Sequence, residues 1–130
     1  MGIGELVKSA DWKAEKHVPV IDAPDAVKVG EAFEITVQVG KEIAHPNVAT
    51  HFIEWIAVYY TENGKQNVWS LARAEFSAHG AAPAGVETSG LFADPKVSFK
   101  VKIPATGKIR AVSYCNIHGL WESEKEIKVQ

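Results

Sequence analysis

The chain has 130 residues, a net charge of −2 and a hydrophobic fraction of 46%. This length and composition are typical of one ordinary globular domain, which we place over residues 1–130. The lack of a basic excess argues against a nucleic-acid binder, and no apolar run approaches the ~20 residues that a membrane helix needs.

The first residues and the cysteine content bear on the compartment. Residues 1–5 have neither the basic start nor the long apolar stretch of a secretory signal. The chain has a single cysteine, so its thiol has no partner for an internal disulfide. We therefore expect a cytoplasmic protein.

The elements follow in chain order. One short helical segment is expected within residues 3–14, and after it the pattern changes to a period of two. The expected strands span residues 33–39, 52–60, 66–76, 97–103, 109–115 and 125–129, with a hairpin turn at residues 62–65. About seven short strands with little helix predict an all-β fold, an immunoglobulin-like antiparallel β-sandwich.

Cys115 and His118 lie three positions apart near the end of an expected strand. A free cysteine is most often a small buried hydrophobic residue. Here residues 116–119 form the expected loop after the strand, and a histidine in that loop is close enough to bind the same metal ion as the cysteine. The spacing therefore favours a metal site.

Three further histidines are candidate ligands. His17 lies just before a proline-containing extended segment, His45 lies in a loop stiffened by Pro46, and His51 opens an expected strand. The loops at the ends of a sandwich can bring such side chains together. His79 lies in a loop of small residues with no second ligand nearby, so we leave it out of the site and expect its replacement to leave the metal content intact.

Thiolate and imidazole ligands suit zinc, copper or iron. Structural zinc would use only four ligands. A blue-copper site also uses Cys-x-x-His on a β-sandwich, but normally adds a weak axial methionine, and the only methionine here is Met1. Iron with four imidazoles and one thiolate would use every candidate except His79. A cupredoxin-like electron carrier and a zinc-stabilised binding module remain the alternatives.

Three separated motifs, Glu15-Lys16-His17-Val18-Pro19, His45-Pro46-Asn47 with His51, and Cys115-Asn-Ile-His118-Gly-Leu-Trp121, closely resemble the superoxide reductase family. They are most similar to its short one-domain form, neelaredoxin. The resemblance implies an immunoglobulin-like sandwich that holds one non-haem iron. It also implies the metal ligands, which are His17, His45, His51 and His118 around the equator, axial Cys115, and Glu15 at the sixth position of the oxidised form.

The resemblance implies a function as well. Superoxide would be reduced to hydrogen peroxide, with Lys16 attracting and orienting the anion and Asn116 or nearby amides bonding to the Cys115 sulfur. Larger family members carry an extra module with iron bound by four cysteines, which a chain with one cysteine cannot form. Electrons would therefore come from a separate donor, by resemblance rubredoxin, and the protein would be a homotetramer.

Overall fold

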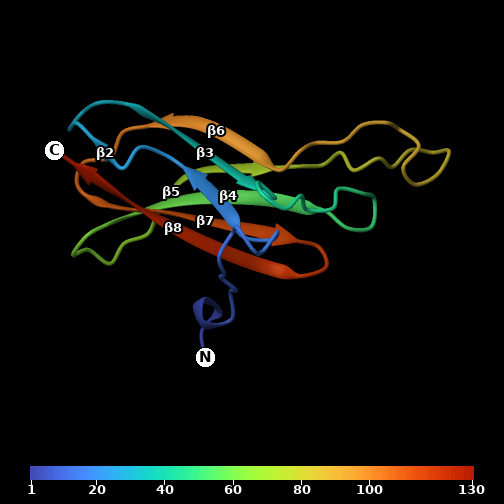
Figure 1. Ribbon diagram of the computed structural model, residues 1–130, viewed down its shortest axis with the longest axis horizontal. Coiled ribbons are helices and arrows are strands. Elements are labelled where there is room, and N and C mark those ends of the chain that lie inside the picture. The colour runs from blue at the N-terminus through green and yellow to red at the C-terminus, as the bar shows by residue number, and fades with distance from the viewer.

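Residues 1–130 of the protein are described by a computed structural model, in which eight strands form two facing sheets (Figure 1). The smaller sheet has the order β1 (Pro19–Asp22), β3 (Phe33–Val39), β6 (Lys96–Val101). The larger has the order β2 (Ala26–Val27), β8 (Gly119–Val129), β7 (Gly107–Cys115), β4 (Ile53–Glu62), β5 (Trp69–Glu75). All pairs are antiparallel except the short β2, which runs parallel to β8.

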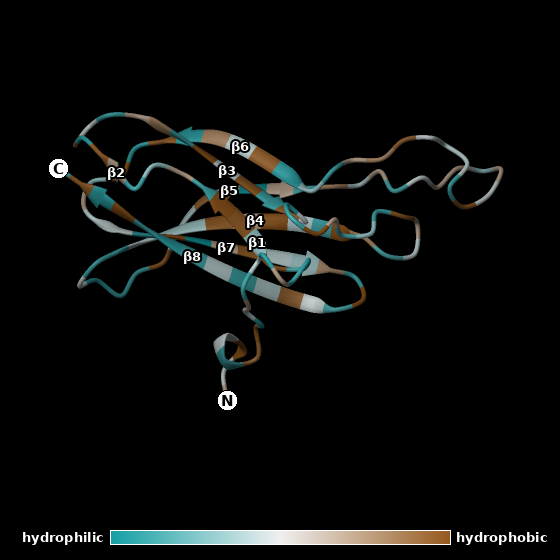
Figure 2. Ribbon diagram, in the orientation of Figure 1, coloured by the Kyte–Doolittle hydropathy of each residue, from teal (hydrophilic) through white to brown (hydrophobic).

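Alternating burial builds the core between the sheets. In β3 the buried residues are Phe33 and every second residue after it, as the period of two predicts. In β7 the same alternation runs through to Cys115, whose side chain is fully buried. Figure 2 shows the hydrophobic stretches of β3 and β4 inside the sandwich. The strand period therefore directs the only thiol inward at the end of a core strand.

The expected all-β sandwich is confirmed, but its parts differ from the expectation, and β1 and β2 were not among the expected strands. The N-terminal helical segment is only one 3₁₀ turn, Ile3–Glu5, which contains no buried residue. Glycines at positions 2 and 4 disfavour a longer helix, and no core contact compensates. The last strand begins at Gly119 rather than at residue 125, and the parallel pairing of β2 was not expected.

Three parts of the chain meet at one end of the sandwich. They are the segment before β1, the β3–β4 loop (residues 40–52) and the β7–β8 turn (residues 116–118). The hairpin turn at residues 62–65 is confirmed at the other end, where the Lys65 amide donates to the Glu62 carbonyl. No helix in the structure has the length and apolar character needed to cross a membrane.

Candidate metal centre

Cys115 and His118 come from the two sides of one tight turn. Cys115 is the last residue of β7 and pairs with Gly119, the first residue of β8. Gly119 has φ 80°, a left-handed conformation that glycine adopts readily, and this closes the turn within three residues. The turn places Nδ1 of His118 3.7 Å from the Cys115 sulfur. The spacing of the two residues therefore brings both donor atoms to one point.

His17 enters from the segment just before β1. Its carbonyl accepts a hydrogen bond from the buried Ser113 hydroxyl at 3.1 Å, which fixes the backbone, and its ring stacks on Trp121. Its Nε2 lies 3.0 Å from Nδ1 of His118. Two nitrogens bound at ~2.1 Å and at right angles to one metal ion would also lie about 3.0 Å apart. The pair is therefore spaced like neighbouring ligands of one ion.

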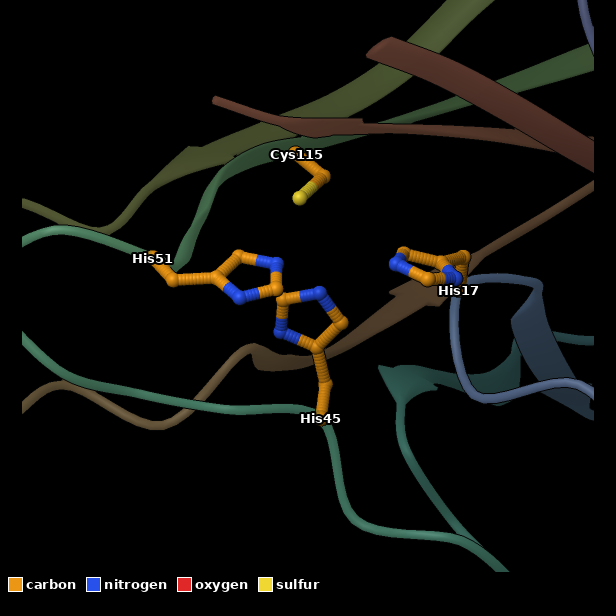
Figure 3. Close-up of side chains that lie close together, drawn as sticks. All are labelled: His17, His45, His51 and Cys115. Carbon is orange, nitrogen blue, oxygen red and sulfur yellow. The ribbon is translucent and has the colours of Figure 1, made fainter. Parts of the chain in front are cut away.

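His45 and His51 both come from the β3–β4 loop. The loop turns back at Gly40, where φ is 90° and a Cβ atom would lie 2.6 Å from the backbone nitrogen of His45, so only glycine fits. His51 is held by a reciprocal pair of backbone hydrogen bonds with Val48. The loop thus presents two imidazoles, six residues apart, toward the end of β7 (Figure 3).

The four imidazole rings are arranged in a closed ring, in which each imidazole lies next to two others. Neighbouring centroids are 4.9 Å apart for His17 and His45, 4.8 Å for His45 and His51, 5.1 Å for His51 and His118, and 4.4 Å for His118 and His17. The diagonal between His17 and His51 is longer, at 6.5 Å. Four rings in this order surround a single point, as equatorial ligands do.

The thiolate completes the donor set. The ligand atoms of His17, His45, His51 and Cys115 all lie within 4.8 Å of one another (Figure 3). The group does not include His118, but the two short distances given above place its Nδ1 beside the group. His79, which sequence reasoning left out, lies outside the group.

The buried nitrogens of the site fit a metal ion. Nε2 of His45 and Nε2 of His51 are buried and have no hydrogen-bond partner. Nδ1–H of His45 donates to the Pro46 carbonyl at 2.7 Å, and because a carbonyl only accepts, the lone pair is on Nε2. A buried imidazole nitrogen with a free lone pair and no partner is costly unless a cation binds it.

Burial also keeps these rings neutral. Desolvation lowers the pKa of His45 to about 4, and the nearby charges of His17, His51 and Lys16 act in the same direction. The pKa of His51 is also lowered, by burial first and then by His118, His17 and Lys16. Neutral imidazole is the form that binds a metal, so burial favours the binding form of both rings.

Glu15 lies on the outer side of His17 rather than among the ligand atoms. Nδ1–H of His17 donates to the Glu15 carboxylate at 2.5 Å, and the His17 amide donates to the same oxygen at 3.0 Å. The hydrogen bond from His17 holds the pKa of Glu15 below its usual value. The carboxylate therefore fixes the tautomer of His17, with the lone pair on Nε2 facing His118.

Lys16 lies close enough to act on the site through its charge. Its ammonium contributes to the lowered pKa of both His45 and His51, and its side chain is partly exposed. It forms no ion pair with a carboxylate. Lys16 is thus a cation beside the ligand group whose charge is not neutralised by a direct contact.

Asn116 has a different place from the one expected. Its side chain accepts from the Phe52 amide at 2.9 Å and donates to the Thr50 carbonyl at 3.0 Å, so it ties the turn to the His51 loop rather than bonding to sulfur. The roles of Ser113 and Trp121 against His17 were also missed. Trp121 follows the Cys-x-x-His motif closely enough to be noticed, whereas nothing in the sequence indicates the partner of Ser113.

The donor set separates the metals considered from the sequence. Four imidazoles and a thiolate exceed the four ligands of structural zinc. The only methionine, Met1, is 91% exposed at the chain start, so the axial ligand of a blue-copper site is missing. Mononuclear iron with nitrogen ligands and one thiolate is the centre that uses every donor present.

Residues 9–124 match the family model described as desulfoferrodoxin. The superoxide reductase of Pyrococcus furiosus is 47% identical over 122 residues, 94% of this chain and 96% of that protein. The neelaredoxin of Megalodesulfovibrio gigas is 42% identical over 130 residues, all of both chains. The reduced superoxide reductase (neelaredoxin) of Archaeoglobus fulgidus has a TM-score of 0.87 at 47% identity, covering 95% of this chain and 98% of that one. The resemblance found in the three motifs is confirmed, and the chain belongs to the desulfoferrodoxin family.

Proposed function

We propose that this protein is a superoxide reductase, which transfers one electron to superoxide so that, with two protons from solvent, hydrogen peroxide is formed. The ring of four imidazoles beside the buried Cys115 sulfur carries the proposal, because together they would supply five ligands to one iron ion. Close similarity to proteins named superoxide reductase, over almost the whole chain, supports it.

The chain's own residues would hold the iron. We assign His17, His45, His51 and His118 as the four nitrogen ligands and Cys115 as the sulfur ligand. When bound, ferrous iron would supply the electron. The buried Cys115 sulfur would be an electron-rich ligand and would donate charge to the iron. Glu15 and the Pro46 carbonyl keep His17 and His45 in the binding tautomer.

Lys16 and Glu15 are assigned the remaining roles. The Lys16 ammonium would draw the superoxide anion to a protein whose net charge is also negative. Glu15 would orient His17 in the form described above, and by family resemblance it would bind the sixth position after oxidation. That second role requires the carboxylate to leave Nδ1 of His17.

The partners and compartment follow from the same site. A chain with one cysteine cannot form a second cysteine-bound iron centre, so a separate electron carrier must reduce it again. We propose a rubredoxin-like donor and, by family resemblance, a homotetramer. A cytoplasmic location suits a protein whose single thiol stays reduced.

Metal analysis of the purified protein tests this function. The protein should be produced with iron, copper and zinc all supplied, and one iron per chain is expected. Superoxide consumption should then depend on added electron donor, with hydrogen peroxide as product. Stoichiometric copper would instead indicate an electron carrier, and stoichiometric zinc a metal-stabilised binding module.

A further inference from the structure

His79 is a buried histidine that lies outside the group of candidate metal ligands. It contacts the β3–β4 loop, which carries two of those ligands, His45 and His51. Its side chain is 8% exposed, and both ring nitrogens have hydrogen-bond partners. Nε2 lies 2.6 Å from the Phe76 carbonyl, within its own turn, and Nδ1 lies 2.8 Å from Oδ1 of Asn47 in the β3–β4 loop. The ring thus connects the β5–β6 loop (residues 76–95) to the β3–β4 loop (residues 40–52), called the ligand loop below.

The direction of these bonds can be assigned. A carbonyl oxygen only accepts, so Nε2 donates to Phe76. The Asn47 amide nitrogen donates to the Ala93 carbonyl at 3.0 Å, which turns the amide oxygen of Asn47 toward His79. Nδ1 therefore donates as well. His79 acts as a double donor, and Asn47 is held from two sides by the β5–β6 loop.

The same ring supports the loop at a second point. The Phe52 ring stacks on His79 with centroids 3.8 Å apart and planes 10° apart. Phe52 immediately follows His51, and Asn47 lies two residues after His45. One side chain thereby contacts the loop close to each of its two candidate ligands.

The base of the β5–β6 loop is rigid enough to serve as a support. The Ala93 amide donates to Ala78 at 2.8 Å, and the Gly80 amide donates to Leu91 at 2.8 Å. Gly80 has φ 88°, and a Cβ atom there would lie 2.7 Å from the Phe92 ring, so the two arms pack closely. His79 is therefore held by contacts within its own loop, in addition to its contacts with the ligand loop.

We propose that His79 is a positioning residue for the metal centre, which acts through Asn47 and Phe52 to fix the loop that presents His45 and His51. This inference rests on the proposed metal centre and revises the expectation that His79 can be replaced without effect on the metal. The competing role is that of a buried histidine that only stabilises the fold. The two roles differ in which of its hydrogen bonds matters for the metal.

Two variants separate these bonds. In His79→Asn the side-chain amide lies near the position of Nδ1 and can still donate to Asn47. In His79→Gln it lies near the position of Nε2 and can still donate to Phe76. Both variants lose the Phe52 stack and one hydrogen bond, so they are matched in their cost to the fold. Only His79→Gln also loses the hydrogen bond to Asn47 in the ligand loop.

The measurement is the rate at which Co²⁺ leaves each protein into excess chelator, followed by its thiolate-to-cobalt absorption. We expect His79→Gln to release Co²⁺ about tenfold faster than the unchanged protein, and His79→Asn to stay within about threefold of it. The melting temperatures of the two metal-free variants should be similar. Equal release rates for the two variants, or an unchanged rate for His79→Gln, would overturn the proposal.

Asn47→Ala provides an independent test, which also applies if the His79 variants fail to fold. It should release Co²⁺ faster than the unchanged protein, and the double variant should release it more slowly than the sum of the two single effects predicts, because both changes break the same hydrogen bond. Additive effects or an unchanged rate in Asn47→Ala would contradict the proposal. Failure of the unchanged protein to bind Co²⁺ with a thiolate band would instead refute the proposed metal centre itself.

Discussion

The Glu15 carboxylate accepts a hydrogen bond from Nδ1 of His17 at 2.5 Å, while Nε2 of the same ring faces His118 and the other candidate ligands. Glu15 therefore supports a candidate ligand in this structure, and the role proposed for it as the sixth ligand would be a second one. The two roles can be separated by substitution.

Glu15→Gln keeps an oxygen that accepts from Nδ1 of His17, whereas Glu15→Ala removes it. We expect both variants to change the ferric absorption spectrum, since neither has a carboxylate for the sixth position. Only Glu15→Ala should also release metal faster, by about tenfold, because His17 loses the partner that fixes its tautomer. An unchanged ferric spectrum in both variants, from acidic to alkaline pH, would rule out Glu15 as the sixth ligand.

Cys115→Ser removes the soft, fully buried donor of the site. We expect loss of the thiolate-to-iron charge-transfer band and of reductase activity. The metal affinity should fall by more than the about 10- to 100-fold typical of losing an outer hydrogen-bond partner. Far-ultraviolet circular dichroism should remain that of a β-sandwich. A variant that keeps the band would show that sulfur is not a ligand.

Lys16→Ala should slow the second-order reaction with superoxide. One ammonium near the site contributes ~1 to 2 kcal/mol of attraction, which corresponds to roughly tenfold in rate. The rate should also become less sensitive to salt, with iron content unchanged. Lys65→Ala is the matched control, because it removes the same charge at the opposite end of the sandwich. Pulse radiolysis at several ionic strengths measures both, and equal behaviour of the two variants would remove the steering role.

The metal-free protein should lose stability as the pH falls from about 6.5 to about 4. The folded pKa of His45 is about 4, mainly through burial, so the unfolded chain takes up a proton first and unfolding is favoured across that window. His51 adds to this in the same direction. Urea unfolding at several pH values measures the slope. His45→Gln should flatten it, and an equally steep slope in that variant would assign the effect to other groups.

The local pattern was enough to predict most of the framework. The alternation in β3 and β7 follows from one buried face, and the Asn63-Gly64 pair predicts the hairpin turn. The candidate ligands could be named because their spacing and residue types form motifs. These ligands come together because the segment before β1, the β3–β4 loop and the β7–β8 turn lie at the same end of the sandwich. The pattern of strands only suggests this arrangement.

The parts that could not be predicted depend on contacts between distant segments. The first residues of β8 pair with the end of β7 from Gly119 onward, and the Lys8 backbone also bonds to Leu120 and Glu122, so the strand begins earlier than its own alternation indicates. His79 and Asn47 are 32 positions apart, and each looks like an ordinary loop residue in its own surroundings. Such pairings are decided by packing of the whole chain and have no local signal.

The separation of the ligands along the chain has a consequence for how the site forms. His17 and His118 face each other across 101 positions, and His45 and His51 come from a third segment. An ion that binds all of them cross-links the two sheets in the native state and has no equivalent partner in the unfolded chain. A short peptide with Cys115 and His118 would hold only two of the five donors. Metal binding should therefore be a late step that depends on correct folding. A chain with misplaced loops should fail to retain the ion.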